Sequence, residues 1–184
     1  MLSQIAAFLV ETVSGFFVFL LLARFHFQWL RAPFHNPVGE FVLALTSWIV
    51  MPVRRVIPGL RGLDLATLFV AWLLRALAIW AEIFIMGGEP RGMPILAVAA
   101  VDLVRFSVYI LIFAVLLQAV LSWFHTYSPL NPMLDAIARP FLRPFRRMIR
   151  PVGGFDLTPL VLLVLLQIVV IVLDYARPLA ARLG

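Results

Sequence analysis

The sequence PVRRVIPGLRGLDL at residues 52–65 returns later in the chain as PFRRMIRPVGGFDL at residues 144–157. The polar positions that match in this register are Arg54 with Arg146, Arg55 with Arg147, and Asp64 with Asp156. Leucine-rich stretches align by accident, but a proline, two arginines and an aspartate at fixed spacing are much harder to obtain by chance. The chain therefore contains an internal repeat, and each copy is one structural unit.

An apolar run lies on each side of this motif in both copies. The four runs cover about residues 2–29, 63–86, 94–123 and 155–173, and each approaches or exceeds the roughly 20 helical residues that cross a bilayer. Of the 184 residues, 64% are hydrophobic and only 13% are charged, with a mean hydropathy of +1.05. A soluble domain is nearer a quarter charged, so the composition indicates a membrane protein.

A short polar turn, Gly87-Gly88-Glu89-Pro90-Arg91-Gly92, divides the chain near its middle. We therefore predict a first repeat at residues 1–88 and a second at residues 93–184, each made of two spans and a basic loop. Two crossings per copy give both copies the same orientation. They are predicted to be parallel repeats, related by an approximate two-fold axis along the membrane normal.

The loop inside each copy is predicted to hold a short helix. Asn36-Pro37 and Asn131-Pro132 are typical helix starts, with asparagine as the cap and proline in the first turn. These helices are too short in their apolar part to span, so they are predicted to be interfacial or re-entrant. Pro140 and Pro144 predict two kinked pieces in the second loop. The predicted fold is all-α, with four transmembrane helices in two tandem hairpins.

Arginine supplies all the basic side chains, since the chain contains no lysine, and the net charge is +6. The two long loops hold most of the arginines, at positions 31, 54, 55, 61, 139, 143, 146, 147 and 150. Positions 91, 177 and 182 lie on the opposite side. The positive-inside rule then places both loops in the cytoplasm and both termini in the periplasm.

These motifs resemble the YggT family of small bacterial membrane proteins, which is related to the YlmG proteins. The resemblance is carried by Asn36-Pro37, residues 52–58, residues 62–65, Leu121-Ser122-Trp123-Phe124, Asn131-Pro132, residues 143–147 and residues 153–159. It implies a multi-pass protein of the bacterial inner membrane. It also implies a link to cell division, envelope organisation or osmotic-stress tolerance, or to cofactor assembly in plastids, with no established reaction.

Two sets of loop residues are candidates for function. The first is a surface that docks anionic lipid or a protein partner, formed by Arg54, Arg55, Arg143, Arg146, Arg147 and Arg150. Each basic residue near an anionic leaflet contributes about 1 kcal/mol. The alternative is that these arginines only set topology. The second set is Asp64 and Asp156, predicted to cap the following spans and to pair with arginines of the same loop.

Polar residues inside the spans form a third candidate site. A charge at the bilayer centre is costly, so it normally faces protein or water. We predict an intramembrane polar seam between the copies, made of Glu11, Arg75, Glu82, Gln118, Gln167 and Asp174. Arg75 is expected to reach Glu11 or Glu82, and Asp102 to pair with Arg105 at the i, i+3 spacing. The seam is interpreted either as structural glue between helices or as an ion path.

The sequence holds no pattern that defines a reaction. His26, His35 and His125 have no spacing that predicts a shared metal or haem, and no cofactor is expected. The leading hypothesis is a non-enzymatic membrane organiser or assembly factor whose partners are lipids, other membrane proteins or further copies of the chain. The alternative is a small transport or ion-permeation unit that uses the seam. Nucleic acid is not expected as a partner.

Overall fold

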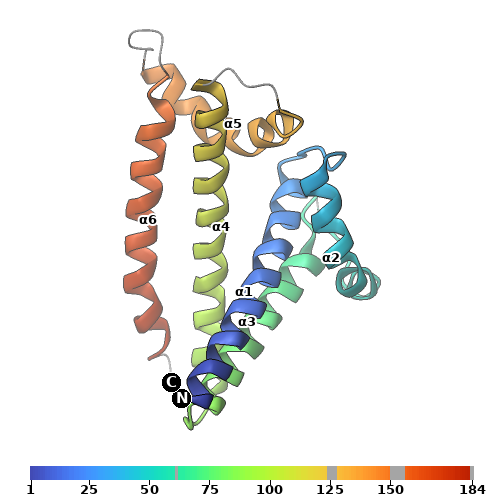
Figure 1. Ribbon diagram of the computed structural model, residues 1–184, viewed down its shortest axis with the longest axis vertical. Helices are drawn as coiled ribbons and strands as arrows, with labels where there is room; N and C mark the ends of the chain where they lie inside the picture. The colour runs from blue at the N-terminus through green and yellow to red at the C-terminus, as the bar shows by residue number, and fades with distance from the viewer. Residues whose placement is uncertain (61, 124–127, 150–155, 183–184) are drawn as a thin grey trace.

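The computed structural model describes residues 1–60, 62–123, 128–149 and 156–182 (Figure 1). Its helices are α1 (Leu2–Trp29), α2 (Pro37–Arg54), α3 (Leu65–Ile85), α4 (Gly92–Trp123), α5 (Asn131–Met148) and α6 (Thr158–Ala180). Four of them, α1, α3, α4 and α6, are long and apolar enough to cross a membrane. The predicted all-α membrane fold with four spanning helices is thus confirmed.

The six helices form two similar halves. Helix α1 packs mainly along α3, and α4 packs mainly along α6, while α3 and α1 contact α4 and join the halves. Figure 1 shows α5 at one end of the molecule and both chain termini at the other, with α2 beside the part of α1 that lies away from the termini. We call these two ends the loop-helix end and the terminal end. The two hairpins therefore run in the same direction, as the repeat predicts.

Close packing between helices holds the halves together. The fully buried apolar side chains include Val18, Leu21, Leu22, Val42, Val50, Val115 and Leu142. Small residues such as Ala71 and Ala99, both fully buried, let helix backbones approach closely. In lipid there is no hydrophobic driving force between helices, so close packing is the main source of their association. Large apolar side chains such as Phe69 and Phe113 point outward instead. Such a surface suits a hydrocarbon environment.

Polar side chains fix where two of the helices begin. Asn36 caps α2, because its Oδ1 accepts a hydrogen bond of 2.9 Å from the Gly39 amide and its Nδ2 donates to the Pro33 carbonyl. Asp64 caps α3 in the same way through the Thr67 amide. Both caps satisfy backbone amides that have no partner within the helix. In the second half, α5 begins at Asn131 itself, one residue earlier than predicted.

Two helix predictions need correction. Helix α5 is one continuous helix with Pro140 and Pro144 inside it, where two pieces were expected. Both prolines lie on its exposed side, while its other face buries Met133, Leu134, Ile137, Ala138 and Leu142. This packing outweighs the loss of two backbone hydrogen bonds. Helix α6 also runs to Ala180, about two turns beyond the expected end, and so carries Arg177.

The turn between the halves is closed by a glycine. The Gly87 amide donates to the Phe84 carbonyl over 3.0 Å, and the Gly88 amide donates to the Ile83 carbonyl over 2.9 Å. Gly87 adopts φ +77°, which a side chain would disfavour. This compact closure brings α4 back beside α3. Of the described helices, α1 to α3 fall within the predicted first repeat, residues 1–88. Helices α4 to α6 match the second, residues 93–184, except that α4 begins one residue earlier, at Gly92.

Gly39 should not tolerate a side chain. A Cβ there would meet the Phe34 backbone, with the Phe34 Cα at 2.8 Å and the carbonyl oxygen closer still. We expect Gly39→Ala to lower the free energy of unfolding by about 1–3 kcal/mol, the usual range for overpacking. Gly15→Ala is the matched control, because nothing lies within 4 Å of a Cβ there. Reversible unfolding in mixed micelles, followed by circular dichroism, measures both; equal stabilities would contradict the predicted clash.

Candidate functional site

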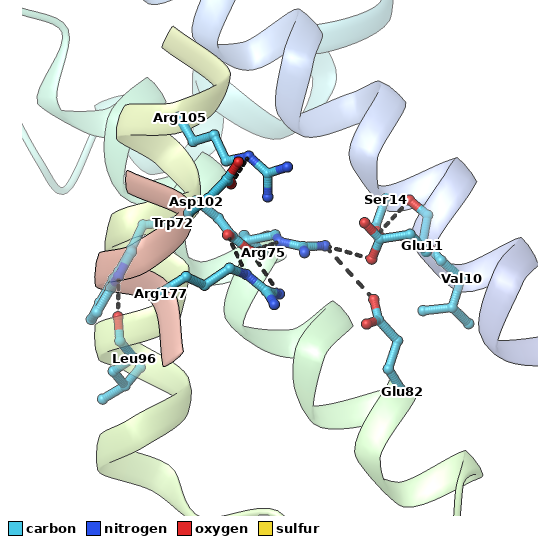
Figure 2. A network of polar contacts seen from close by, with 11 residues as sticks. Val10, Glu11, Ser14, Trp72, Arg75, Glu82, Leu96, Asp102, Arg105 and Arg177 are labelled. Atoms are coloured by element: carbon cyan, nitrogen blue, oxygen red, sulfur yellow. Dashed lines mark hydrogen bonds and ion pairs between the residues drawn. The ribbon is translucent and has the colours of Figure 1, made fainter. Parts of the chain in front are cut away.

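All four spanning helices contribute to one group of charges with a buried centre at Arg75 and Asp102, which we call the charge cluster. It consists of Glu11 from α1, Arg75 and Glu82 from α3, Asp102 from α4 and Arg177 from α6 (Figure 2). Charged side chains inside apolar spans are costly unless they are paired. The cluster satisfies this requirement by joining residues from both halves of the chain.

Arg75 is the centre of the charge cluster. Its Nε donates to Asp102 Oδ2 over 2.8 Å, and its Nη1 donates to Glu11 Oε2 over 2.9 Å. Glu82 lies farther away, with Oε1 at 3.7 Å from the same Nη1. The Arg75 side chain is only 4% exposed, and it also lies over the Phe106 ring. The sequence predicts that Arg75 reaches Glu11 or Glu82, and in the structure it binds Glu11 and lies near Glu82.

Asp102 binds two arginines from different helices. Besides Arg75, it accepts hydrogen bonds from Arg177 Nε at 2.8 Å and from Arg177 Nη2 at 3.4 Å. The sequence did not predict that Asp102 would bind Arg75 or Arg177. Arg177 was missed because α6 was expected to end before it. A charged residue at position 102, well inside an apolar run, was the available signal. The Asp102 side chain is almost fully buried, so both of its oxygens depend on these partners.

The expected pair between Asp102 and Arg105 is replaced by contacts between helices. Arg105 Nε lies 3.1 Å from Asp174 Oδ1 on α6 and 3.2 Å from the Tyr109 hydroxyl. The prediction considered only neighbours along α4, and such pairs within a helix contribute little. Arg75 and Arg177 approach Asp102 from two other helices and occupy both of its oxygens.

The predicted seam does not continue through the molecule. Gln167 lies on the exposed surface of α6 and is not part of the charge cluster, so this part of the seam prediction is wrong. In the repeat, Gln167 matches Arg75 in its position along the helix. However, the rotation of α6 about its axis turns this position away from the other half. Gln118 instead donates to Asp135 Oδ1 of α5 over 3.1 Å. In the first half, Arg24 similarly donates to Thr46 of α2 over 2.9 Å.

The loop-helix end carries the same charge pair in both halves, which we call the latches. Arg54 pairs with Asp64, and Arg146 Nε lies 3.0 Å from Asp156 Oδ2. Asp156 also accepts from the Thr158 amide at 2.9 Å, although the helix cap itself is Leu157. The pairing of each aspartate with an arginine of its own loop agrees with the prediction.

The latches lower the pKa of both aspartates. Burial alone would raise the pKa of Asp64, but hydrogen bonds from Arg54 and Thr67 outweigh it and bring the pKa below its usual value of 3.8. The pKa of Asp156 is lowered in the same way, against burial, by Thr158 and Arg146. Both carboxylates are therefore ionised at neutral pH, when each latch has its full charge.

The predicted docking arginines lie mostly in the open. Arg55, Arg143, Arg146 and Arg147 are exposed, and Arg54 is half-buried by its latch. Arg150 lies outside the described residues. Helix α5 is strongly amphipathic, with its apolar side against the core and its arginines on the other side. Such a helix is suited to an anionic membrane surface.

Cavities occur next to the charge cluster at the terminal end. One of about 510 Å³ is lined by Glu82, Glu89, Arg91 and Arg177 among apolar residues of α3, α4 and α6. A second of about 480 Å³ is lined by Glu11, Glu82 and Arg177. Within the described ranges, no three histidine, aspartate or glutamate side chains are grouped to hold a metal ion. His125 lies outside these ranges.

The chain is similar to known bacterial proteins over nearly its whole length. The family model described as CCB3/YggT matches residues 3–84 and 97–176. A protein of Escherichia coli (strain K12) called uncharacterized protein YggT is 35% identical over 164 residues, which are 88% of this chain and 85% of that protein. An uncharacterized protein of Pseudomonas aeruginosa is 30% identical over 172 residues, 91% of this chain and 87% of its own length. No solved structure matches the chain significantly.

Removing Arg75 should destabilise the protein strongly. Arg75→Gln leaves Glu11 without its arginine and Asp102 with Arg177 alone, and breaking a buried pair in this way costs about 3–5 kcal/mol. Gln167→Leu is the control on the exposed surface of α6 and should leave stability unchanged. The measurement is reversible unfolding in mixed micelles. Unchanged stability of Arg75→Gln would exclude any structural role for the cluster.

Stability should fall in acid through the latches. A carboxylate with a lowered pKa stabilises the fold above the pKa of the unfolded chain, and this contribution is lost as the pH falls through the folded pKa. Asp64→Asn should therefore be less stable than the natural protein at pH 7, and the difference should shrink below about pH 4. Asp156→Asn should show the smaller effect, since Asp156 is more exposed than Asp64. A difference that is independent of pH would contradict this account.

Proposed function

This chain belongs to the CCB3/YggT family of membrane proteins, and from that premise we propose that it is a non-enzymatic organiser of the bacterial inner membrane. It docks anionic lipid through the arginines of α2 and α5, and in this way takes part in envelope organisation, cell division or osmotic-stress tolerance. In this proposal the loop-helix end faces the cytoplasm, since the arginines of the long loops gather there.

The single observation that carries the proposal is the exposed row of arginines on α5. Arg139, Arg143, Arg146 and Arg147 share one amphipathic helix, and their neighbours on its other face are packed into the core. The fold therefore fixes the arginines in place and neutralises only half of them, since Arg139 and Arg146 form ion pairs while Arg143 and Arg147 form none with the described residues. Two of the four are left for phosphate groups of the leaflet.

The alternative of an ion-permeation unit receives less support. Arg75 and Asp102 are both nearly fully buried, so the centre of the cluster is closed to bulk solvent. Gln167 lies on the outside of α6, and the polar contacts of Gln118 are made with α5 at the loop-helix end. The residues of the predicted seam therefore form separate groups, and a continuous polar path would have to pass through Arg75.

Removing free arginines should weaken selection for anionic lipid. We expect the double variant Arg143→Gln with Arg147→Gln to lower the preference for phosphatidylglycerol over phosphatidylcholine by up to about 30-fold, because each arginine contributes about 1 kcal/mol and 1.4 kcal/mol is tenfold. The preference is measured by electron spin resonance of spin-labelled lipids with the protein in vesicles. These two residues are chosen because neither takes part in a latch.

The matched control removes the same charge elsewhere. Arg91→Gln with Arg182→Gln lies at the terminal end and should leave the lipid preference unchanged if the docking surface is at α5. Equal loss in both double variants would mean that only net charge matters. A photoreactive residue at position 147 in native membranes supplies a second measurement. Adducts with lipid support the proposal, and a single abundant protein adduct would replace lipid docking by protein docking.

A further inference from the structure

The charge cluster contains one carboxylate more than it contains arginines. Glu11, Glu82 and Asp102 carry three negative charges, and Arg75 and Arg177 carry two positive charges. The neighbouring pair of Arg105 and Asp174 is neutral and does not change the balance. With every group ionised, a net negative charge would be held among four apolar helices, where an uncompensated charge is costly.

Glu82 is the carboxylate with the weakest compensation. Arg75 Nη1 is 2.9 Å from Glu11 but 3.7 Å from Glu82, which is too long for a hydrogen bond. Arg177 is held on Asp102 by its Nε and Nη2. The Glu82 Oε1 atom is enclosed and accepts no hydrogen bond from the described residues. An ionised oxygen in this position would lack both water and a donor.

Glu82 and Glu11 approach the same nitrogen of Arg75 from two helices, and Figure 2 shows the two carboxylates on one side of that guanidinium. A proton on Glu82 would allow its hydroxyl to donate to the Glu11 carboxylate, and it would bring the charge of the cluster to zero. Two carboxylates that share a site commonly hold one proton between them. One proton on Glu82 would thus account for both the absence of a hydrogen-bond donor to this carboxylate and the excess negative charge.

The pair is accessible from the terminal end. Both cavities at this end are lined by Glu82 and Arg177, and one of them also by Glu11. The other charged groups that line them are Glu89 and Arg91, from the turn between α3 and α4. Glu82 lies two turns beyond Arg75 on α3, towards the terminal end, so a proton can exchange with it through these cavities without crossing the buried centre at Arg75.

We propose that Glu82, together with Glu11, is a proton-binding site that holds one proton at neutral pH and exchanges it through the terminal-end cavities. A metal cation is less suited to this position, because Arg75 lies against the same carboxylates and Arg177 lines the same cavities. Hard cations also require several oxygen ligands. The site is separate from the arginines of α5, and it does not depend on lipid docking.

Infrared spectroscopy of the protein in lipid vesicles tests the site directly. A protonated carboxyl group gives a C=O stretch that an ionised one lacks, and we expect this band to be present at pH 7 and lost in alkaline solution. Glu82→Gln keeps the shape of the neutral acid and should remove the band. Glu40→Gln, an exposed acid at the start of α2, is the matched control and should keep it. Absence of the band in the natural protein at pH 7, or its persistence in Glu82→Gln, overturns the proposal.

A second variant tests the charge count itself. Glu11→Gln leaves two carboxylates against two arginines, so the excess charge is gone and Glu82 should lose its proton at a lower pH than in the natural protein. This shift is read on the natural Glu82, and it does not require Glu82→Gln to fold. An unchanged or raised transition would overturn the proposal. Loss of the band on addition of sodium or potassium at constant pH would show a cation site instead.

Discussion

The neutralisation of Arg75 in the interior of the spanning bundle is the constraint on which the rest of the structure depends. A guanidinium cannot lose its proton in proteins, so it must find carboxylates or reach water. Glu11 comes from α1 and Asp102 from α4, at 2.9 and 2.8 Å. These two contacts fix α3 against one helix of its own half and one helix of the other half. In hydrocarbon, where apolar side chains gain little by associating, such polar contacts help to set the arrangement of helices.

The two halves keep their symmetry at one end and lose it at the other. At the loop-helix end each half has an arginine on its loop helix and an aspartate before the next span, joined as a latch. At the terminal end the charges are exchanged. Glu11 on α1 pairs with an arginine on α3. Arg105 on α4, which matches Glu11 when Trp29 is aligned with Trp123, pairs with an aspartate on α6. The latches, which both halves share, hold the loops. The charges at the terminal end, which differ between the halves, hold the halves together.

The sequence was sufficient for those features that depend on length, composition and repetition. The four spans, the common orientation of the hairpins, the cap at Asn36 and both latches follow from local patterns or from the repeat. It failed where helix rotation decides the outcome. Gln167 matches Arg75 in register but faces outward, and Arg177 reaches Asp102 because α6 continues beyond its most apolar part. The sequence pattern of one helix does not determine which side of a second helix it packs against.

The charge cluster also explains why two copies are needed in one chain. In the first half alone, Arg75 would keep Glu11 and a distant Glu82 but would lose Asp102. In the second half alone, Asp102 would keep only the half-exposed Arg177. Each half thus contains a buried charge that would lose a partner at 2.8 Å if the other half were absent. Two identical copies could not satisfy both Arg75 and Asp102, because the position of Arg75 in the first copy is occupied by Gln167 in the second. The divergence of the copies is therefore part of what holds them together.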